Sequence, residues 1–215
     1  MNYLISSILF TLIILSPNEA SSSYPKHWWG PTDTTGGVPS WEILPEAGIP
    51  NKTLILSKRN ELGVLSNFAP TPFYFEGKNY ASLEGFWQAM KYPEKGENRY
   101  HGERLPFSRE EVEQMVAFEA KKAGTLASKL MKKYKINYVS FKGERFTYRT
   151  KEKGKHYELI KRAMREKLNQ NDEVRDILVS TKGLELLPDH QTSEDSPPAW
   201  KYYKIWMEER EQLLQ

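Results

Sequence analysis

The sequence predicts an α+β domain that is mainly α-helical and carries small β-hairpins. Three observations support this class: a helix start with a full capping signal, two short β-rich runs that each turn at a glycine, and several stretches with helical spacing of apolar residues. The chain of 215 residues fits one domain and can bury a sizeable core. Its hydrophobic content of 39%, with 13% aromatic residues, indicates a globular protein rather than a disordered one.

Composition excludes several classes of function. The net charge of +3, from 31 basic and 28 acidic residues, excludes a histone-like nucleic-acid binder but allows a local basic pocket for a phosphate. The chain has no cysteine, so it has no disulfide, no thiolate nucleophile and no cysteine zinc site. Its four histidines show no metal-ligand spacing. We therefore expect no metal and no cofactor.

Residues 1–23 have the features of a signal peptide. Residues 4–15 form an apolar run that is shorter than the roughly 20 residues of a membrane span, and small residues follow at 20–23. The side chains before the run are uncharged, which leaves a buried helix or an uncleaved anchor as alternatives. We expect a secreted or periplasmic protein, with a cytoplasmic location as the alternative. No later run reaches membrane length, so no stable membrane span is expected.

Residues 24–53 are predicted to form an N-terminal arm rich in proline and tryptophan. This segment has no clear period and carries Trp28, Trp29 and Trp41. A free linker seldom carries three indoles, because they are costly to leave in water. The arm therefore either packs its tryptophans on the main domain or lines a substrate cleft.

The main domain is predicted to span residues 54–215. Residues 54–56 read as a short buried strand, and residues 73–80 as a hairpin that turns at a glycine. A helix is expected over residues 83–92, where Pro93 ends it.

The best-marked helix begins at Ser108, which forms a capping box with Glu111. Apolar residues continue at helical spacing as far as Leu130, and Gly124 is where we expect a bend. The remaining elements are a hairpin and three helices, at residues 138–148, 155–169, 172–180 and 196–214.

The candidate chemistry lies on the helix at 83–92. At 100° per residue, Gln88 and Lys91 fall at about 40° and 340° from Glu84, so the three polar side chains share a narrow stripe. Ser82 is a natural N-cap, which places Glu84 in the first turn, where the helix dipole favours an ionised carboxylate. The alternative is an amphipathic helix whose solvated face carries these residues.

The residues around this helix follow a family pattern. They are Leu65-Ser66-Asn67-Phe68, Pro72, Gly77, Tyr80, Ser82, Glu84, Gln88, Ala89 and Lys91. This block resembles the signature of the NADAR (YbiA-like) family. Two later blocks, Met164 to Thr181 with Lys167, and Ile205 to Arg210, resemble its closing helices. The resemblance covers roughly residues 54–213 and implies the NADAR fold.

Three positions depart from that pattern. Gly85 stands where most members carry histidine, and Gly124-Thr125 stands where they carry Gly-Arg. The family's D-x-x-W-G segment is replaced by a stretch that contains Asp189 and His190. These departures concern the substrate rather than the fold.

The resemblance implies an N-glycosidase, a hydrolase that cleaves an N-glycosidic bond to ribose. Its substrate would be of the phosphoribosyl type, such as an intermediate of riboflavin synthesis, or a small nucleotide sugar like NAD or ADP-ribose. Nucleic acid is expected only as a carrier of ADP-ribose on guanine. The alternative is a non-catalytic module that binds NAD or ADP-ribose. An exported enzyme would meet extracellular NAD or ADP-ribose derivatives.

On this reading Glu84 and Lys91 are the catalytic residues. Glu84 stabilises the oxocarbenium-like state or activates water, and Lys91 binds a phosphate or forms a Schiff base. Gln88 is expected to bind the ribose hydroxyls. Four further residues are assigned to the substrate, each with a plainer alternative: Asn67 (or a turn former), Arg59 (or a surface arginine), and Asp189 and His190 (or the start of a surface loop).

Overall fold

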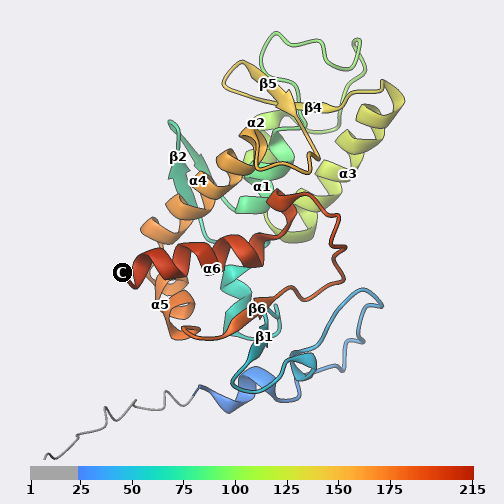
Figure 1. Ribbon diagram of the computed structural model, residues 1–215. Coiled ribbons are helices and arrows are strands. Elements are labelled where there is room, and N and C mark those ends of the chain that lie inside the picture. Colours follow the sequence, from blue (N-terminus) through green and yellow to red (C-terminus); the bar gives the residue numbers. More distant parts are fainter. Residues whose placement is uncertain (1–23) are drawn as a thin grey trace, which may run out of the picture.

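The computed structural model describes residues 24–215, and the predicted signal peptide lies outside this range. Within it, six α-helices combine with three two-stranded sheets and four short 3-10 helices (Figure 1). In chain order the elements are η1 (Lys26–Trp29), η2 (Pro45–Ala47), β1 (Thr53–Ile55), η3 (Glu61–Leu65), β2 (Phe73–Phe75), β3 (Lys78–Tyr80), α1 (Leu83–Ala89), α2 (Arg109–Glu113), α3 (Ala117–Lys133), β4 (Tyr138–Phe141), β5 (Glu144–Thr147), α4 (Lys155–Gln170), α5 (Asp172–Ser180), β6 (Glu185–Leu187), η4 (Pro198–Trp200) and α6 (Tyr202–Leu213).

The fold is a mixture of helices and small sheets in which helices predominate only modestly. The two predicted hairpins are confirmed as the antiparallel pairs β2–β3 and β4–β5. The third sheet is not a hairpin, because β1 pairs in parallel with β6, more than 120 residues later, with Thr53 opposite Glu185. This sheet and the β4–β5 hairpin lie toward opposite ends of the molecule (Figure 1).

Three predicted helices differ from the structure. The helix expected over residues 83–92 ends at Ala89, because the chain turns at residues 90–92 before Pro93. The expected continuous helix after Ser108 is two helices, α2 and α3, broken at residues 114–116 rather than at Gly124. The break lets two carbonyl oxygens leave the helical ladder: that of Glu113 accepts from the Ala81 backbone N–H at 3.1 Å, and that of Met115 from the Ser82 hydroxyl at 2.8 Å. The last helix begins at Tyr202, because the prolines before it form the 3-10 turn η4 instead.

Helix α1 is the centre of the domain. It contacts α2, α3 and α4, and each of its residues is buried (Figure 1). Ser82 caps it as predicted, accepting a hydrogen bond from the Gly85 N–H at 2.9 Å. A Cβ atom at Gly85 would lie 2.5 Å from the Met115 carbonyl oxygen, so the close approach of the α2–α3 connection requires glycine there.

The later sequence blocks hold the segment that precedes α1. The Lys167 ammonium, in α4, donates to the carbonyl oxygens of Val64 at 2.7 Å and Ser66 at 2.9 Å. The Trp206 indole, in α6, donates to the Leu65 carbonyl oxygen between them at 2.7 Å. Three consecutive carbonyls are thus fixed from two helices, so these distant blocks position the loop before α1.

The N-terminal arm packs two of its tryptophans and leaves the third exposed. Trp28 is buried, and the Trp29 indole donates to the Thr53 carbonyl oxygen at 2.8 Å. Trp41 remains 43% exposed. Arg59 fastens this part of the arm, because its guanidinium binds both carboxylate oxygens of Glu42, at 2.7 and 2.6 Å.

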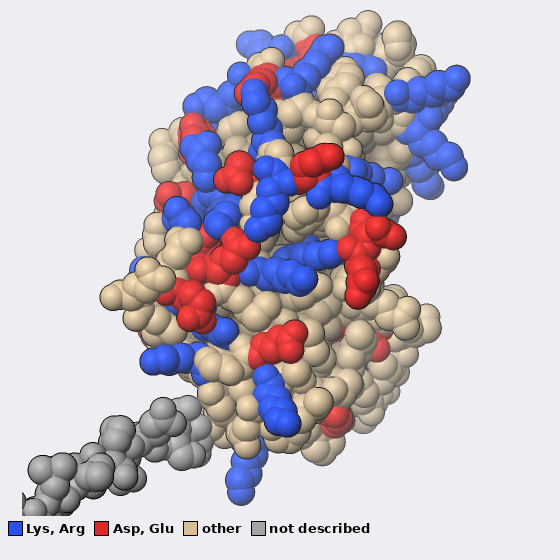
Figure 2. All heavy atoms as spheres, viewed as in Figure 1, with Lys and Arg blue, Asp and Glu red and all other residues tan. Residues whose placement is uncertain are grey.

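Charges of both signs are interspersed over the face shown in Figure 2, in line with the small net charge. Among residues 24–215, no helix combines the length and apolarity that crossing a membrane requires.

Candidate functional site

The predicted polar stripe lies inside the protein, with Glu84 and Gln88 on α1 and Lys91 two residues past its end. Glu84, Gln88 and Lys91 are only 7%, 8% and 5% exposed. The alternative of a solvated amphipathic face is therefore wrong, because helices pack against α1 on several sides. Burying three polar side chains together is costly unless they have partners.

Part of that cost is met within the stripe. The Gln88 amide donates to Oε1 of Glu84 at 2.8 Å. Within residues 24–215, we find no hydrogen bond to the second oxygen, Oε2. The side-chain amide oxygen of Gln88, Oε1, points toward α3, where a Cβ atom at Gly124 would lie 1.7 Å from it. The bare backbone at Gly124 therefore makes room for Gln88.

Electrostatics at Glu84 result from opposed effects. Burial raises its pKa above the ordinary value, while the Gln88 hydrogen bond and then the charges of Lys91, Lys121 and Lys58 act to lower it. The net direction is upward, which differs from the ionised first-turn carboxylate expected from the sequence. That expectation included the helix terminus but could not include burial.

The space at Gly124 leads to a prediction. We expect Gly124→Ala to displace the flexible Gln88 side chain and remove its hydrogen bond to Glu84, so the pKa of Glu84 rises further. Carboxyl carbon shifts followed by NMR against pH measure this. Gly154→Ala is the control, because a Cβ atom there meets nothing within 4 Å. An unchanged titration of Glu84 in Gly124→Ala would contradict the assignment.

Lys91 lies at the other end of the stripe, with an aromatic neighbour. Its ammonium donates to the Ser128 hydroxyl at 3.0 Å and lies 5.3 Å from the centre of the Tyr148 ring. Tyr148 in turn meets His156 edge to face at 5.3 Å. Burial, and secondarily the charge of Lys91, lowers the pKa of His156 to about 4, so the His156 ring is neutral at physiological pH.

Asp189 and His190 form a second polar group, which includes Lys58. The Asp189 carboxylate is buried, forms an ion pair with the Lys58 ammonium and lies 3.0 Å from Nδ1 of His190. Burial acts to raise the pKa of Asp189, but His190 and Lys58 outweigh it and lower the pKa. The His190 ring stacks at 6.3 Å on Tyr202. Asp189 thus belongs to the interior rather than to a surface loop.

Direct contacts join three of the predicted site residues, Asn67, Glu84 and Gln88. The Asn67 carbonyl oxygen accepts from the Glu84 N–H at 2.9 Å, and the Asn67 side-chain oxygen is buried without a partner within the described range. Arg59 does not contact these residues. Its guanidinium donates to Glu42 and to the carbonyl oxygen of Asp33, both in the arm. We assign Arg59 to holding the arm.

Sequence reasoning missed Lys58, Lys121 and Tyr148. A single lysine or tyrosine has no spacing that marks it, and these three come from a loop, a helix and the end of a hairpin. The position of Lys58 directly before the assigned Arg59 was the one local signal.

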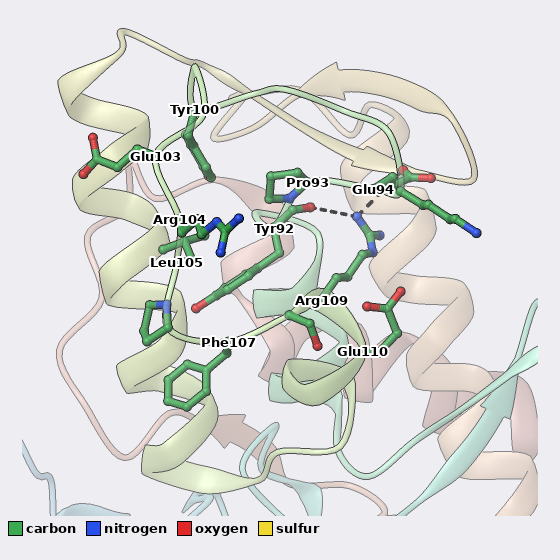
Figure 3. A pocket seen from close by; sticks show the side chains of 13 residues that line it. Tyr92, Pro93, Glu94, Tyr100, Glu103, Arg104, Leu105, Phe107, Arg109 and Glu110 are labelled. Atoms are coloured by element: carbon green, nitrogen blue, oxygen red, sulfur yellow. Dashed lines mark hydrogen bonds and ion pairs between the residues drawn. The ribbon is translucent and has the colours of Figure 1, made fainter.

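Two hollows lie near these elements. One, of about 460 Å³, is lined by Lys58, Phe68 and Phe118, whereas Glu84 lies in the interior and does not line it. The other, of about 550 Å³, lies at the C-terminal end of α1 (Figure 3). Its central Arg109 is engaged by the protein itself, donating to the Tyr92 carbonyl oxygen at 3.1 Å and facing Glu94 at 3.7 Å. The first hollow is therefore the better candidate for a substrate.

Comparison with known proteins gives one distant similarity. No family model matches the chain, and no curated protein matches it significantly. The NMR structure of the E. coli protein YbiA is similar at 19% sequence identity and a TM-score of 0.43, covering 77% of this chain and 87% of that one. A similarity of this size does not show a family, so the resemblance of the sequence blocks remains a prediction.

Proposed function

We propose that this protein is a hydrolase that cleaves the N-glycosidic bond to a ribose carrying a phosphate or ADP group. The observation that carries the proposal is Glu84, a buried carboxylate with one oxygen free of hydrogen bonds from the described residues and with three lysines close enough to act on its pKa. The family resemblance of the surrounding block supports the same chemistry.

The reaction uses the carboxylate of Glu84 and its raised pKa. As the bond from the anomeric carbon to the base nitrogen breaks, its electron pair leaves with the base, and the ribose becomes oxocarbenium-like. Glu84 stabilises this positive charge, accepts a proton from the water that attacks the anomeric carbon, and releases that proton to the departing base nitrogen or to solvent. A raised pKa brings a carboxylate closer to the operating pH of a general base, which suits this proton transfer.

The lysines supply the complement to an anionic substrate. Lys91 is held over the Tyr148 ring face and by Ser128. A ring face attracts a cation, so these contacts hold the Lys91 ammonium in position to bind a phosphate. Gln88 and Asn67 are placed to orient the ribose. His190, held by Asp189, binds a hydroxyl or phosphate at the edge of the site.

Turnover tests the proposal. The full chain is incubated with an N-glycoside of ribose 5-phosphate, with NAD, and with DNA that carries ADP-ribose on guanine, and released base and sugar are separated by chromatography. We expect release from at least one of them. If all three stay intact while ADP-ribose binds, the chain is instead a non-catalytic ADP-ribose-binding module.

A further inference from the structure

Three aromatic side chains from separate parts of the chain meet at the surface beside Lys58. They are Trp41 of the arm, Phe68 of the loop before β2, and Phe118 in the first turn of α3. The ring centres of Phe68 and Phe118 are 5.1 Å apart, and those of Trp41 and Phe118 are 6.3 Å apart. Trp41 is 43% exposed and Phe118 58%, so two large neighbouring rings are left in water. Adjacent exposed apolar groups of this size indicate a contact surface.

Two lysines flank these rings. The ammonium of Lys58 lies 5.3 Å from the centre of the Phe68 ring and 5.8 Å from that of Trp41. The ammonium of Lys121 lies 5.6 Å from the Phe68 ring. Phe68 directly follows Asn67, whose carbonyl oxygen accepts from the Glu84 N–H at 2.9 Å, so the aromatic group adjoins the chain segment that contacts Glu84.

The exposed rings and the two lysines together indicate which kind of ligand would bind here. A free phosphate would use the lysines and leave the rings in water, whereas an apolar ligand would cover the rings and give Lys121 no anion to pair with. A planar base joined to a diphosphate uses both, since bases stack on aromatic side chains and phosphates pair with ammonium groups.

We propose that Trp41, Phe68 and Phe118 form a stacking subsite for the nucleobase of a nucleoside diphosphate that is joined to the reacting ribose. This inference rests on the proposed function and narrows it. A substrate whose ribose carries a single phosphate has no second base to place there, so the subsite favours the ADP-ribosyl class over the phosphoribosyl class.

The arm holds Trp41 in place for this role. Its neighbour Glu42 is bound by Arg59, and the Ile43 N–H donates to the Asp189 carbonyl oxygen at 2.7 Å. Trp41 lies outside the stretch of family resemblance, so its part in the subsite follows from the structure and not from that resemblance.

Direct binding tests the subsite without requiring turnover. ADP and inorganic pyrophosphate are titrated into the full chain by calorimetry. We expect Trp41→Ala and Phe118→Ala each to weaken ADP binding about tenfold while leaving pyrophosphate binding unchanged. Trp41→Tyr should restore most of the ADP affinity. Tyr74→Ala is the matched control, since Tyr74 is an exposed aromatic residue on β2, away from the three rings.

The outcomes separate this proposal from the proposed function. Wild-type affinity for ADP in both alanine variants, or ADP that binds no tighter than pyrophosphate, overturns the subsite even if an N-glycoside is cleaved. Loss of ADP affinity in these variants supports the subsite even if the turnover assay shows no hydrolysis.

Discussion

Replacing Glu84 with glutamine is expected to reduce the rate of N-glycoside release by about 10²–10⁴-fold, the contribution typical of a general acid or base. Glutamine keeps the size of the side chain and can still accept the hydrogen bond from Gln88. It cannot stabilise a cationic ribose by charge or take a proton from water. We therefore expect kcat to fall while ADP-ribose binding changes little.

Stability distinguishes the catalytic role of Glu84 from a structural one. Because burial raises the pKa of Glu84, the ionised side chain is costly in the folded state, and a neutral amide should leave the melting temperature unchanged or slightly higher. Glu110→Gln is the matched control, since Glu110 lies in the first turn of α2 but is exposed. Activity close to wild type in Glu84→Gln, or a large fall in its melting temperature, would rule out the catalytic assignment.

The sequence predicted the stripe on α1 because its information is local. Ser82 marks the helix start, and helical spacing aligns Glu84 with Gln88, although α1 ends at Ala89, before the limit that Pro93 sets. What covers a helix depends on distant segments. The glycine at 124, which makes room for Gln88, was read as a bend because its role appears only when α3 lies against α1.

The same limit explains the errors elsewhere. The break between α2 and α3 follows from hydrogen bonds with Ala81 and Ser82, which no pattern within residues 108–130 encodes. The pairing of β1 with β6 joins two three-residue strands far apart in the chain, too short for a period to identify both. The charge of Arg59 alone suggests substrate binding, and its partner Glu42 is identified only in the folded arm.

Lys167 is the residue whose replacement should cost the most stability. Its fully buried ammonium bridges the carbonyl oxygens of Val64 and Ser66, next to the loop whose Asn67 carbonyl receives the N-terminus of α1. Lys167→Ala leaves both carbonyls without a donor and opens a cavity. We expect it to lower the free energy of unfolding by about 3–5 kcal/mol, as measured by denaturant titration.

The pH dependence of a second variant identifies the amine as the cause. Burial lowers the pKa of Lys167 to about 7 in the folded protein, whereas an unfolded lysine titrates near 10.4. Between these values the unfolded state binds more protons, so the contribution of Lys167 to stability increases with pH, by about 2 kcal/mol from pH 7 to pH 9. Lys167→Met fills the space without titrating, so its deficit relative to wild type should widen over that range. Lys155→Met, at an exposed lysine of the same helix, should show no such widening. If the deficit of Lys167→Met is constant with pH, the buried amine does not titrate in this window, and Lys167 acts through packing and hydrogen bonds alone.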